Sequence, residues 1–337
     1  MIITYGTIGT NWITDSWVIA AQKAGGWQLD AVYSRSKEQA EKFGKKYSVT
    51  NFYTSLDDLA ASSIQAVYIA SPNSLHYEQA KQMLLAKKHV LLEKPATSTV
   101  AELDDLFRRA KEQGVYLIEA FRHIQEANYK LLKKAINDER RLGPIYGASF
   151  TYASYSSRYN NVLAGETPNI FSLDFSGGSL VDIGVYPVTF AVALFGPPKS
   201  TTYVPFIAAT GVDGGGVGIL HYDGFGVQIN HSKGYRSTSP CEVYGEKGTI
   251  TVNGTTDISS VKHWSPKTKE IEELAGGYKT AEKPNVNMEE EAIEFARIIN
   301  EKDTKALEEL ETISRNVIKV TTHMRRQGGI VYPADKK

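Results

Sequence analysis

The amino-acid sequence predicts an α/β protein with two domains. The first is a doubly wound parallel sheet with helices on both faces, and the second is an α+β domain with a large open, mainly antiparallel sheet. Over residues 1 to about 120, short apolar runs alternate with longer segments of helical period, as they do in β-α-β units. From residue 145 onward, runs rich in Thr, Tyr and Val alternate with short turns. The length of 337 residues, with 42% hydrophobic residues, suits two packed cores better than one.

The composition excludes several classes of partner. The 38 basic and 38 acidic residues give a formal net charge of zero, so no broad field favours nucleic acid or an anionic membrane. The single cysteine, Cys241, cannot form an intrachain disulfide, and the seven histidines show no metal-site spacing. Glycines break the first apolar run too early for a signal peptide, and no other run is long enough to cross a membrane. We therefore expect a cytoplasmic protein without a structural metal.

The first domain is expected to contain a series of buried parallel strands separated by helices. The strands are predicted at Ile2–Ile8, Leu29–Ser34, Val49–Tyr53, Ala66–Ser71, Val90–Glu93 and Val115–Glu119. Helix starts are indicated by pairs with capping-box spacing, which are Ser36 with Gln39, Ser55 with Asp58 and Thr99 with Glu102. Helix ends are expected at Gly25-Gly26 and at Gly114.

The turn after the first strand stands where a dinucleotide-binding fold has the pattern G-x-G-x-x-G/A. It reads Gly9-Thr10-Asn11-Trp12-Ile13-Thr14, so only the first glycine keeps its place. Asn11 stands where the backbone would approach a pyrophosphate, but asparagine tolerates unusual backbone angles and its amide can donate to a phosphate. On its own this pattern is weak, and an ordinary turn remains the alternative.

The second strand ends without the acidic residue that an NAD site uses to bind the ribose hydroxyl. That place is held by Ser34, followed by Arg35 and Ser36. An arginine can pair with a phosphate or stack on adenine, and the helix that starts here adds its dipole, so NADP is preferred over NAD. Asp30 is expected to lie too early in the strand to reach the ribose. The alternative is a solvated basic turn in which Ser36 only caps the helix.

The next ligand-facing strand end is predicted at Ser71-Pro72-Asn73. Small residues and a proline at the carboxyl end of a parallel strand leave room for a ligand, and Ser74 is expected to cap the following helix. His76 lies in the first turn of that helix, and it is either a surface residue or a ligand contact.

The stretch from His89 to Thr97 is predicted to be the catalytic edge of this sheet. Its apolar run stops at Glu93-Lys94-Pro95, as a buried strand does where its last residues face a ligand. Pro95 has no N–H and biases Lys94 away from the helical region, so Lys94 is presented at a turn. Glu93 either contacts the nicotinamide ribose or holds the turn.

A second domain is expected after an amphipathic helix that runs from residue 121 to about 140 and is stopped by Gly143-Pro144. An antiparallel meander is predicted from the strands Tyr146–Tyr155, Thr201–Ile207, Gly216–Tyr222, Gly226–His231, Glu242–Tyr244 and Thr249–Val252. Two helices with apolar stripes are predicted near Val286–Asn300 and at Leu307–Gln327. Within this domain Asp182 and Tyr186 are four residues apart and would share a face of a helix, although Gly184 and Pro187 disturb its regularity. The alternative is an aspartate cap and an ordinary half-buried aromatic.

Taken together, these segments resemble the Gfo/Idh/MocA family of oxidoreductases, and the similarity covers nearly the whole chain. The Glu93-Lys94-Pro95 turn and the segment Gly177-Gly178-x-x-x-Asp182-Ile183-Gly184-x-Tyr186-Pro187 carry most of it. A tyrosine at position 186 resembles the branch of dihydrodiol dehydrogenases, D-xylose:NADP dehydrogenases and glucose-fructose oxidoreductase. The resemblance implies a Rossmann domain over residues 1–121 and a substrate-binding and dimerisation domain over 122–337. It also implies that the last helix returns to the first domain and that the open sheet is covered by a second subunit in a homodimer.

The resemblance also implies which residues bind the cofactor. They are Gly9, Thr10, Asn11, Trp12, Ile13, Ser34, Arg35, Ser71, Pro72, Asn73, His76, Glu93 and Lys94.

The predicted reaction is reversible, NADP(H)-dependent oxidation of a secondary alcohol on a sugar, polyol or dihydrodiol. Transfer of a hydride to a carbonyl leaves an alkoxide that needs a proton. A free tyrosine holds its proton to about pH 10, and a neighbouring ammonium favours the ionised form. Tyr186 is therefore assigned as acid/base, Lys94 as its electrostatic partner and Asp182 as an orienter of a substrate hydroxyl or of Lys94, although Tyr186 and Lys94 could exchange roles.

Four further residues are candidates for the substrate pocket, with a surface or packing role as the alternative for each, namely Arg122, His123, Tyr155 and Arg158. Two alternatives remain for the function as a whole. One is a non-catalytic NADP-binding regulator of the same fold. The other is a family glycosidase that uses bound NAD for transient redox elimination.

Overall fold

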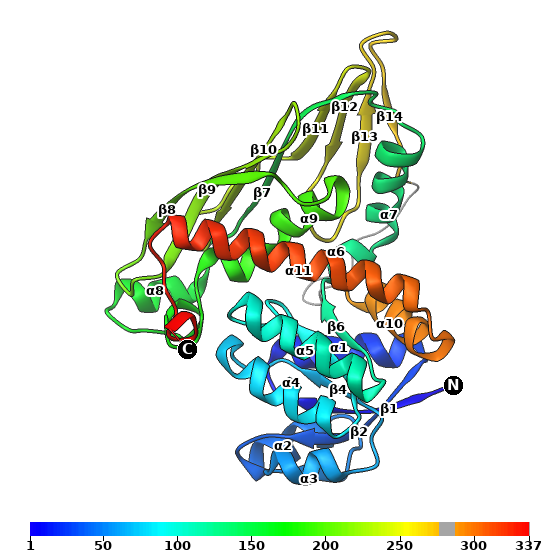
Figure 1. Cartoon of the computed structure of the whole chain (residues 1–337), viewed down its shortest axis with the longest axis vertical. Helices are drawn as coiled ribbons and strands as arrows, with labels where there is room; N and C mark the ends of the chain where they lie inside the picture. The colour runs from blue at the N-terminus through cyan, green and yellow to red at the C-terminus, as the bar shows by residue number, and fades with distance from the viewer. Residues whose placement is uncertain (276–286, 337) are drawn as a thin grey trace. The chain divides into compact units, whose positions relative to one another are not determined.

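The computed structural model describes residues 1–275 and 287–336, which form two compact units (Figure 1). The first unit contains Met1–Ala120 and the later described residues up to Arg315; the second contains residues 121–275 and those from Asn316 onward. One limit therefore falls within the long helix α11 (Thr304–Gln327). The domain boundaries expected from the sequence, 1–121 and 122–337, remain a prediction.

The described part of the first unit is built on a six-stranded sheet in the order β3-β2-β1-β4-β5-β6. Every neighbouring pair is parallel, and the reversal of strand order at β1 confirms the predicted doubly wound sheet. The strands are β1 (Ile3–Ile8), β2 (Trp27–Tyr33), β3 (Asn51–Tyr53), β4 (Ala66–Ile69), β5 (His89–Glu93) and β6 (Leu117–Ala120).

Helices cover this sheet, with α3, α4 and α5 packed side by side and α1 packed with α10 (Figure 1). The predicted start of α10, near Val286, lies outside the described residues. The helices of the first unit are α1 (Trp12–Ala24), α2 (Lys37–Lys45), α3 (Leu56–Ala61), η1 (Asn73–Leu75), α4 (His76–Leu85), α5 (Val100–Gln113) and α10 (Glu289–Glu301), together with the first half of α11.

The predicted helix caps are found, with one exception. Thr99 and Glu102 form a complete capping box on α5, and the side chain of Ser36 caps α2. The prediction that Ser74 caps the following helix is wrong. It lies inside the short turn η1, and α4 begins at His76 without a side-chain cap.

The core of this unit joins the sheet to α10. The ring of Trp17 stacks on Tyr68 with centroids 4.7 Å apart, and Phe295 of α10 packs against the same tryptophan. The indole N–H of Trp27 donates to the carbonyl of Ala292 over 2.8 Å. A helix distant in sequence therefore completes the hydrophobic layer on one face of the sheet.

The described part of the second unit is built on an eight-stranded sheet in the order β14-β13-β12-β11-β7-β10-β9-β8. The mainly antiparallel sheet is confirmed, but the meander is wrong in one respect, because β10 pairs with β7 in parallel. Strands β13 and β14 were not predicted. The strands are β7 (Ile145–Ala153), β8 (Ser200–Ile207), β9 (Asp213–His221), β10 (Gly226–Ser232), β11 (Cys241–Gly245), β12 (Gly248–Val252), β13 (Val261–Trp264) and β14 (Ile271–Glu273).

The predicted helix from residue 121 to about 140 is broken at Glu126. Its backbone is extended there (φ −58°, ψ 136°), because its carboxylate accepts hydrogen bonds from the distant backbone N–H groups of Asp257 (2.9 Å) and Ile258 (2.7 Å). The helices of this unit are α6 (Arg122–Gln125), α7 (Ala127–Lys133), η2 (Lys134–Asp138), α8 (Ser157–Leu163), η3 (Asn169–Phe171), η4 (Leu180–Gly184), α9 (Val185–Phe195) and η5 (Pro333–Lys336), together with the second half of α11.

The two faces of the second sheet differ. Helix α9 packs on one face, where Phe190 meets Phe150 at a centroid distance of 5.0 Å. On the other face, side chains such as Val204 and Val217 are exposed, and these two residues are paired across β8 and β9.

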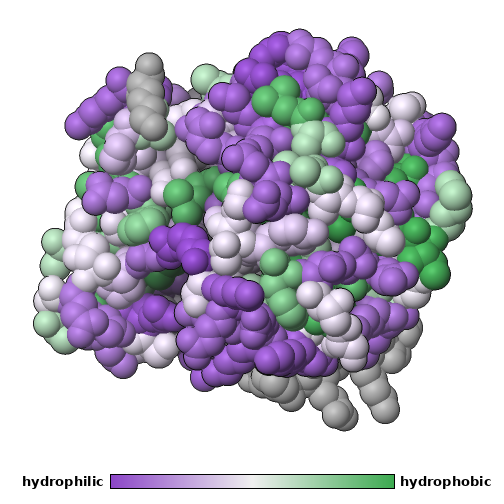
Figure 2. Space-filling view, turned by 90° about the horizontal axis from the view of Figure 1, so that it is seen from below, coloured by the Kyte–Doolittle hydropathy of each residue, from purple (hydrophilic) through white to green (hydrophobic). Residues whose placement is uncertain are grey.

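The surface seen in Figure 2 is mostly polar, and its apolar residues lie in small groups. Scattered apolar residues of this kind are normal on a surface in contact with water. Among residues 1–275 and 287–336, no helix has the length and apolar character needed to cross a membrane.

Candidate functional site

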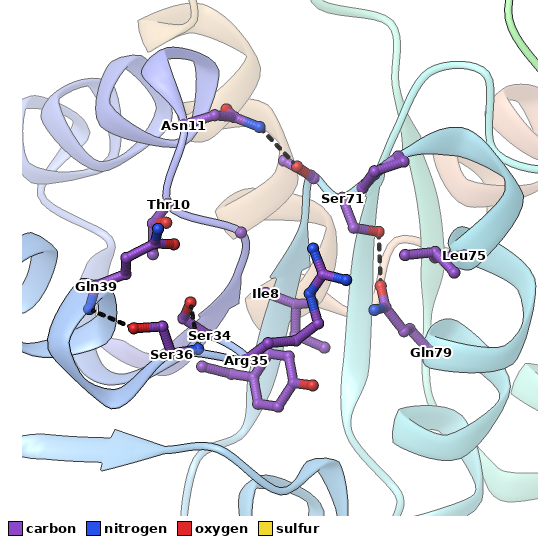
Figure 3. Close-up of a pocket in the computed structure, with 14 residues that line it drawn as sticks. Ile8, Thr10, Asn11, Ser34, Arg35, Ser36, Gln39, Ser71, Leu75 and Gln79 are labelled. Atoms are coloured by element: carbon purple, nitrogen blue, oxygen red, sulfur yellow. Dashed lines mark hydrogen bonds between the residues drawn. The ribbon is translucent and has the colours of Figure 1, made fainter. Parts of the chain in front are cut away.

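The turn between β1 and α1 brings the backbone of Gly9 against the end of β4. Gly9 has a φ of 115°, and a Cβ atom there would lie 2.7 Å from the carbonyl oxygen of Ala70, so only glycine fits. Asn11 caps α1 by accepting from the N–H groups of Ile13 (3.0 Å) and Thr14 (3.2 Å), and it donates to the Ala70 carbonyl (2.9 Å) (Figure 3). The amide predicted to donate to a phosphate therefore already organises the turn through both its oxygen and its nitrogen.

The end of β2 presents hydroxyls and a cation. Ser34 accepts from the N–H of Ser36 (3.3 Å), and Ser36 accepts from the N–H of Gln39 (3.3 Å). The exposed Arg35 side chain reaches into the middle of the space drawn in Figure 3, and it has no acceptor among the described residues. Asp30 lies outside this group and accepts from the amide of Asn51 (3.2 Å). This edge is therefore suited to an anion.

These strand ends enclose a pocket of about 600 Å³, within the usual size range of a cofactor site. It meets the requirements of a dinucleotide at three points: the glycine-only turn at Gly9, the start of α1 and the guanidinium of Arg35. No carboxylate is among the described residues that line it. They are Ile8, Gly9, Thr10, Asn11, Tyr33, Ser34, Arg35, Ser36, Gln39, Ala70, Ser71, Pro72, Leu75 and Gln79.

The end of β4 is tied to the next strand by His76. Its Nε2 lies 2.9 Å from the carbonyl oxygen of Ser71 and its Nδ1 lies 3.0 Å from that of Pro95. The side chain is buried, and burial lowers its pKa. His76 is therefore not a surface residue, and it connects two loops at the edge of the pocket. The hydroxyl of Ser71 donates to Gln79 over 2.6 Å.

The Glu93-Lys94-Pro95 turn is supported by a second buried carboxylate. Glu93 accepts from the Tyr68 hydroxyl (2.6 Å) and from the N–H of Lys94 (3.2 Å), so in this structure it holds the turn. The Lys94–Pro95 peptide bond is cis. Glu119 of β6 accepts from the N–H of Ala96 (2.8 Å), and burial raises the pKa of Glu119 to about 7.

In the second unit, a buried network holds the turn that carries Asp182. Asp213 accepts from the N–H of Leu180 (2.6 Å) and from the hydroxyl of Tyr203 (2.9 Å), and burial raises its pKa to about 6. Tyr203 is also 3.1 Å from Nε2 of His231, whose Nδ1 is 2.9 Å from the hydroxyl of Ser179. Asp182 lies in the π-helical turn η4, and this network fixes the start of that turn.

Lys233 pairs with Asp182 and was not among the residues predicted from the sequence. Lys233 follows β10 directly and its ammonium contacts the Asp182 carboxylate. Side chains in this stretch alternate between the two faces, so Lys233 falls on the same covered face as Val227, Ile229 and His231. A lysine that continues a buried face is unusual, and that pattern could have identified it.

Tyr186 lies in the first turn of α9 and is buried among rings and one guanidinium. His123 meets its ring edge-on with centroids 4.9 Å apart, Tyr152 does so at 5.3 Å, and Arg122 lies 5.8 Å from the ring centroid. Arg122 is held by both carboxylate oxygens of Asp257, at 3.0 and 2.9 Å. Of the predicted substrate-pocket residues, these contacts bring Arg122 and His123 to Tyr186.

The remaining predicted residues are more scattered. Trp12 is exposed at the start of α1, Ile13 packs against the core, and Asn73 begins η1. Tyr155 and Arg158 are exposed on the second unit. Lys94 belongs to the first unit and Tyr186 to the second, so their pairing stays a prediction, as do the cofactor-binding roles assigned above.

Six residues of the pocket wall were not predicted from the sequence, namely Ile8, Tyr33, Gln39, Ala70, Leu75 and Gln79. Helical spacing contained a signal for some of them. Gln39 is three residues beyond the cap Ser36, and Leu75 and Gln79 are four residues apart. Residues at this spacing share one face of a helix, and here that face is turned toward the ends of the strands.

Comparisons with known proteins match both units. A family model described as "Oxidoreductase family, NAD-binding Rossmann fold" matches residues 3–121, and one described as "GFO/IDH/MocA C-terminal domain" matches residues 129–251. The chain is 40% identical over 338 residues to the uncharacterized oxidoreductase YgjR of Escherichia coli (strain K12), covering 99% of each chain. It is 39% identical to scyllo-inositol 2-dehydrogenase (NADP(+)) IolU of Bacillus subtilis (strain 168), covering 99% of this chain and 100% of the relative.

A solved structure has the same fold at lower identity. It is that of KijD10, a 3-ketoreductase from Actinomadura kijaniata, in complex with NADP and TDP-benzene. The identity is 22%, the TM-score is 0.79, and the match covers 96% of this chain and 98% of that one.

Proposed function

This chain belongs to the Gfo/Idh/MocA family of NAD(P)-dependent oxidoreductases, and from that premise we propose that it oxidises a secondary alcohol on a polyol-like ring, reversibly and with NADP. The observation that carries the proposal is the pocket at the carboxyl edge of the parallel sheet. Its described walls contain the guanidinium of Arg35 and no carboxylate. An NAD site would need an acid at the end of β2, whereas a ribose phosphate needs a cation.

The residues present fit this cofactor in three places. Gly9 and the start of α1 would take the pyrophosphate, and Ser34, Arg35 and Ser36 would take the phosphate on the adenosine ribose. The contacts proposed nearer the nicotinamide are Asn73, His76, Glu93 and Lys94, with Ser71 and Pro72 at the sheet edge. When bound, the cofactor accepts or supplies the hydride.

The chain's own residues would supply the proton transfer. We assign Tyr186 as the group that takes the proton from the substrate hydroxyl during oxidation and returns it during reduction. Its ring is fixed by three neighbours, so its hydroxyl keeps one direction. Lys94 is the proposed partner of Tyr186 and would donate to the substrate oxygen, and Asp182 would accept from a neighbouring hydroxyl.

A polyol or a related ring diol is the proposed substrate class. The B. subtilis relative, which is matched over its whole length, is named a scyllo-inositol dehydrogenase that uses NADP(+). The carboxylate of Asp182 can accept a hydrogen bond from a substrate hydroxyl, and the ammonium of its partner Lys233 can donate to another. A ring with several hydroxyls requires both kinds of partner.

A homodimer through the open sheet is part of the proposal. On that face Thr202, Ile219, Gln228, Ser149 and Glu242 lie in one row across β8, β9, β10, β7 and β11. This row is in part exposed, and Val204 and Val217 are exposed apolar side chains on the same face, which a second copy would cover.

A substrate and cofactor panel tests the proposal. The purified protein is assayed with scyllo-inositol, myo-inositol, D-xylose, D-glucose and trans-1,2-cyclohexanediol, each with NADP and with NAD, and the reduced cofactor is followed by absorbance. We expect turnover of at least one polyol with a clear preference for NADP. Turnover that prefers NAD would contradict the role of Ser34 and Arg35. Tight NADP binding without turnover of any compound would support the non-catalytic regulator instead.

A further inference from the structure

Lys233 is a buried lysine whose backbone is fixed on both sides. Its N–H donates to the carbonyl of Gly214 (2.8 Å), and its carbonyl accepts from the N–H of Ser156 (2.9 Å). Both bonds continue the sheet beyond β10, so the side chain keeps the direction of His231, two residues earlier, toward the covered face. The position of the ammonium is therefore set by the sheet and does not depend on a mobile loop.

The ammonium of Lys233 has fewer acceptors than donors. Its side chain is 10% exposed, it pairs with Asp182, and it lies 5.6 Å from the ring centroid of Phe171. An ammonium carries three N–H donors, and within residues 1–275 and 287–336 its one hydrogen-bond acceptor is Asp182. Leaving a buried charge without full hydrogen bonding costs free energy, so the remaining donors favour a ligand with acceptor oxygens.

The partner carboxylate, Asp182, is the residue assigned to the substrate. It lies in η4, four residues before Tyr186, and its side chain is 20% exposed. Both members of the pair therefore lie in the second unit, on the same side of its sheet as the proposed acid/base.

We propose that Lys233 and Asp182 form a subsite for two neighbouring hydroxyls of the substrate, a proposal that rests on the proposed function. One hydroxyl would donate to the Asp182 carboxylate, and the next would accept from Lys233. The carboxylate accepts and the ammonium donates, so the pair suits two neighbouring uncharged hydroxyls, each of which can do both. Lys233 is thus a specificity-determining residue of the second unit.

A stability role alone does not account for the pair. Buried ion pairs contribute little net stability, and hydrophobic replacements of similar volume are often neutral or stabilising. A lysine on a covered sheet face is therefore better explained by a ligand than by folding.

The test compares Lys233→Met, Lys233→Arg and a surface control. The control is Lys199→Met, since Lys199 also pairs with an aspartate, Asp223, but the two side chains are 67% and 83% exposed. Two probes are used with NADP-loaded enzyme: scyllo-inositol, and a monodeoxy analogue that lacks the hydroxyl next to the oxidised carbon. Binding is measured by calorimetry, and kcat and KM are measured for each probe.

We expect Lys233→Met to weaken binding of scyllo-inositol about 10- to 100-fold, because a hydrogen bond to a charged group is lost. In the kinetics the loss should appear mainly as a higher KM. The preference for scyllo-inositol over its deoxy analogue should shrink by a similar factor. Lys233→Arg should recover most of both losses, and Lys199→Met should change neither. If Lys233→Met does not fold, the double variant Asp182→Asn with Lys233→Met removes both charges and is compared with Asp182→Asn alone.

The outcomes separate this inference from the proposed function. Unchanged binding and unchanged preference in Lys233→Met, with turnover intact in the wild type, would overturn the subsite alone. Failure of the wild type to bind either probe or any other neutral polyol would overturn both the subsite and the proposed substrate class. Full turnover in Tyr186→Phe would remove the acid/base assignment, whereas the effect of Lys233 on binding would still be expected.

Discussion

Replacing Arg35 with alanine should weaken NADP binding and leave NAD binding unchanged. The guanidinium reaches into the pocket beside Ser34 and Ser36, and no described residue accepts a hydrogen bond from it (Figure 3). Its removal therefore breaks no hydrogen bond or ion pair among residues 1–275 and 287–336. The loss should appear in the affinity for the phosphorylated cofactor and not in the stability of the fold.

The magnitude follows from the contact that Arg35 is proposed to make. Hydrogen bonds to charged groups contribute roughly 1.5–3 kcal/mol, and each 1.4 kcal/mol is a factor of ten, so the Kd for NADP should rise roughly 10- to 100-fold. Exposed substitutions away from special features change the free energy of unfolding by about 0.5 kcal/mol or less, and Arg35→Ala should fall within that range.

Calorimetric titration of both cofactors at one fixed salt concentration measures this effect, because charge interactions are screened by salt. Lys37→Ala is the matched control. This exposed cation lies two residues away and outside the pocket wall, so the variant should bind both cofactors as the wild type does. An equal loss for NAD and NADP, or no loss for NADP, would refute the role given to Arg35.

Three further predictions follow from single positions. Gly9→Ala should abolish measurable cofactor binding, because the new Cβ would lie 2.7 Å from the Ala70 carbonyl oxygen. Titration of the variant with NADP measures the effect, and retained binding would contradict the prediction. Glu119 has a folded pKa of about 7 against an ordinary 4.5, so its contribution to stability is present below about pH 4.5 and is lost as pH rises through 7. In the wild type, this contribution should lower the free energy of unfolding by at most about 3 kcal/mol between pH 4.5 and 8, and Glu119→Gln should lack that decrease. Urea titration at both pH values measures it, and an equal decrease in the variant would count against the prediction. Val217→Glu should convert the proposed dimer to a monomer in sedimentation, whereas Leu163→Glu, an exposed apolar position on α8, should not.

The sequence predicted the first sheet well because buried parallel strands are apolar on both faces and their ends are marked by turn residues. The run that ends at Glu93 is a full strand, and the Thr99–Glu102 spacing is a complete capping box. These features depend on residues close together in the chain, so local pattern is enough to find them.

The features that were missed depend on contacts between distant residues. The break at Glu126 is caused by N–H groups more than 130 residues away, and helix periodicity cannot register them. The Asp182–Lys233 pair joins residues 51 apart, and the parallel pairing of β7 with β10 depends on how the chain crosses the sheet. The burial of His76 depends on two carbonyls from different loops, so its first-turn position alone could not reveal it.

Tyr186 is the group proposed to transfer the substrate proton, and replacing it with phenylalanine removes the hydroxyl that would carry that proton. In Tyr186→Phe, NADP-dependent oxidation of scyllo-inositol should lose at least about 100-fold in kcat/KM, the usual contribution of a positioned acid/base. The Kd for NADP should stay as in the wild type, because Tyr186 lies outside the pocket wall. A Tyr186→Phe variant that turns over scyllo-inositol within a few-fold of the wild-type rate would contradict the acid/base role of Tyr186.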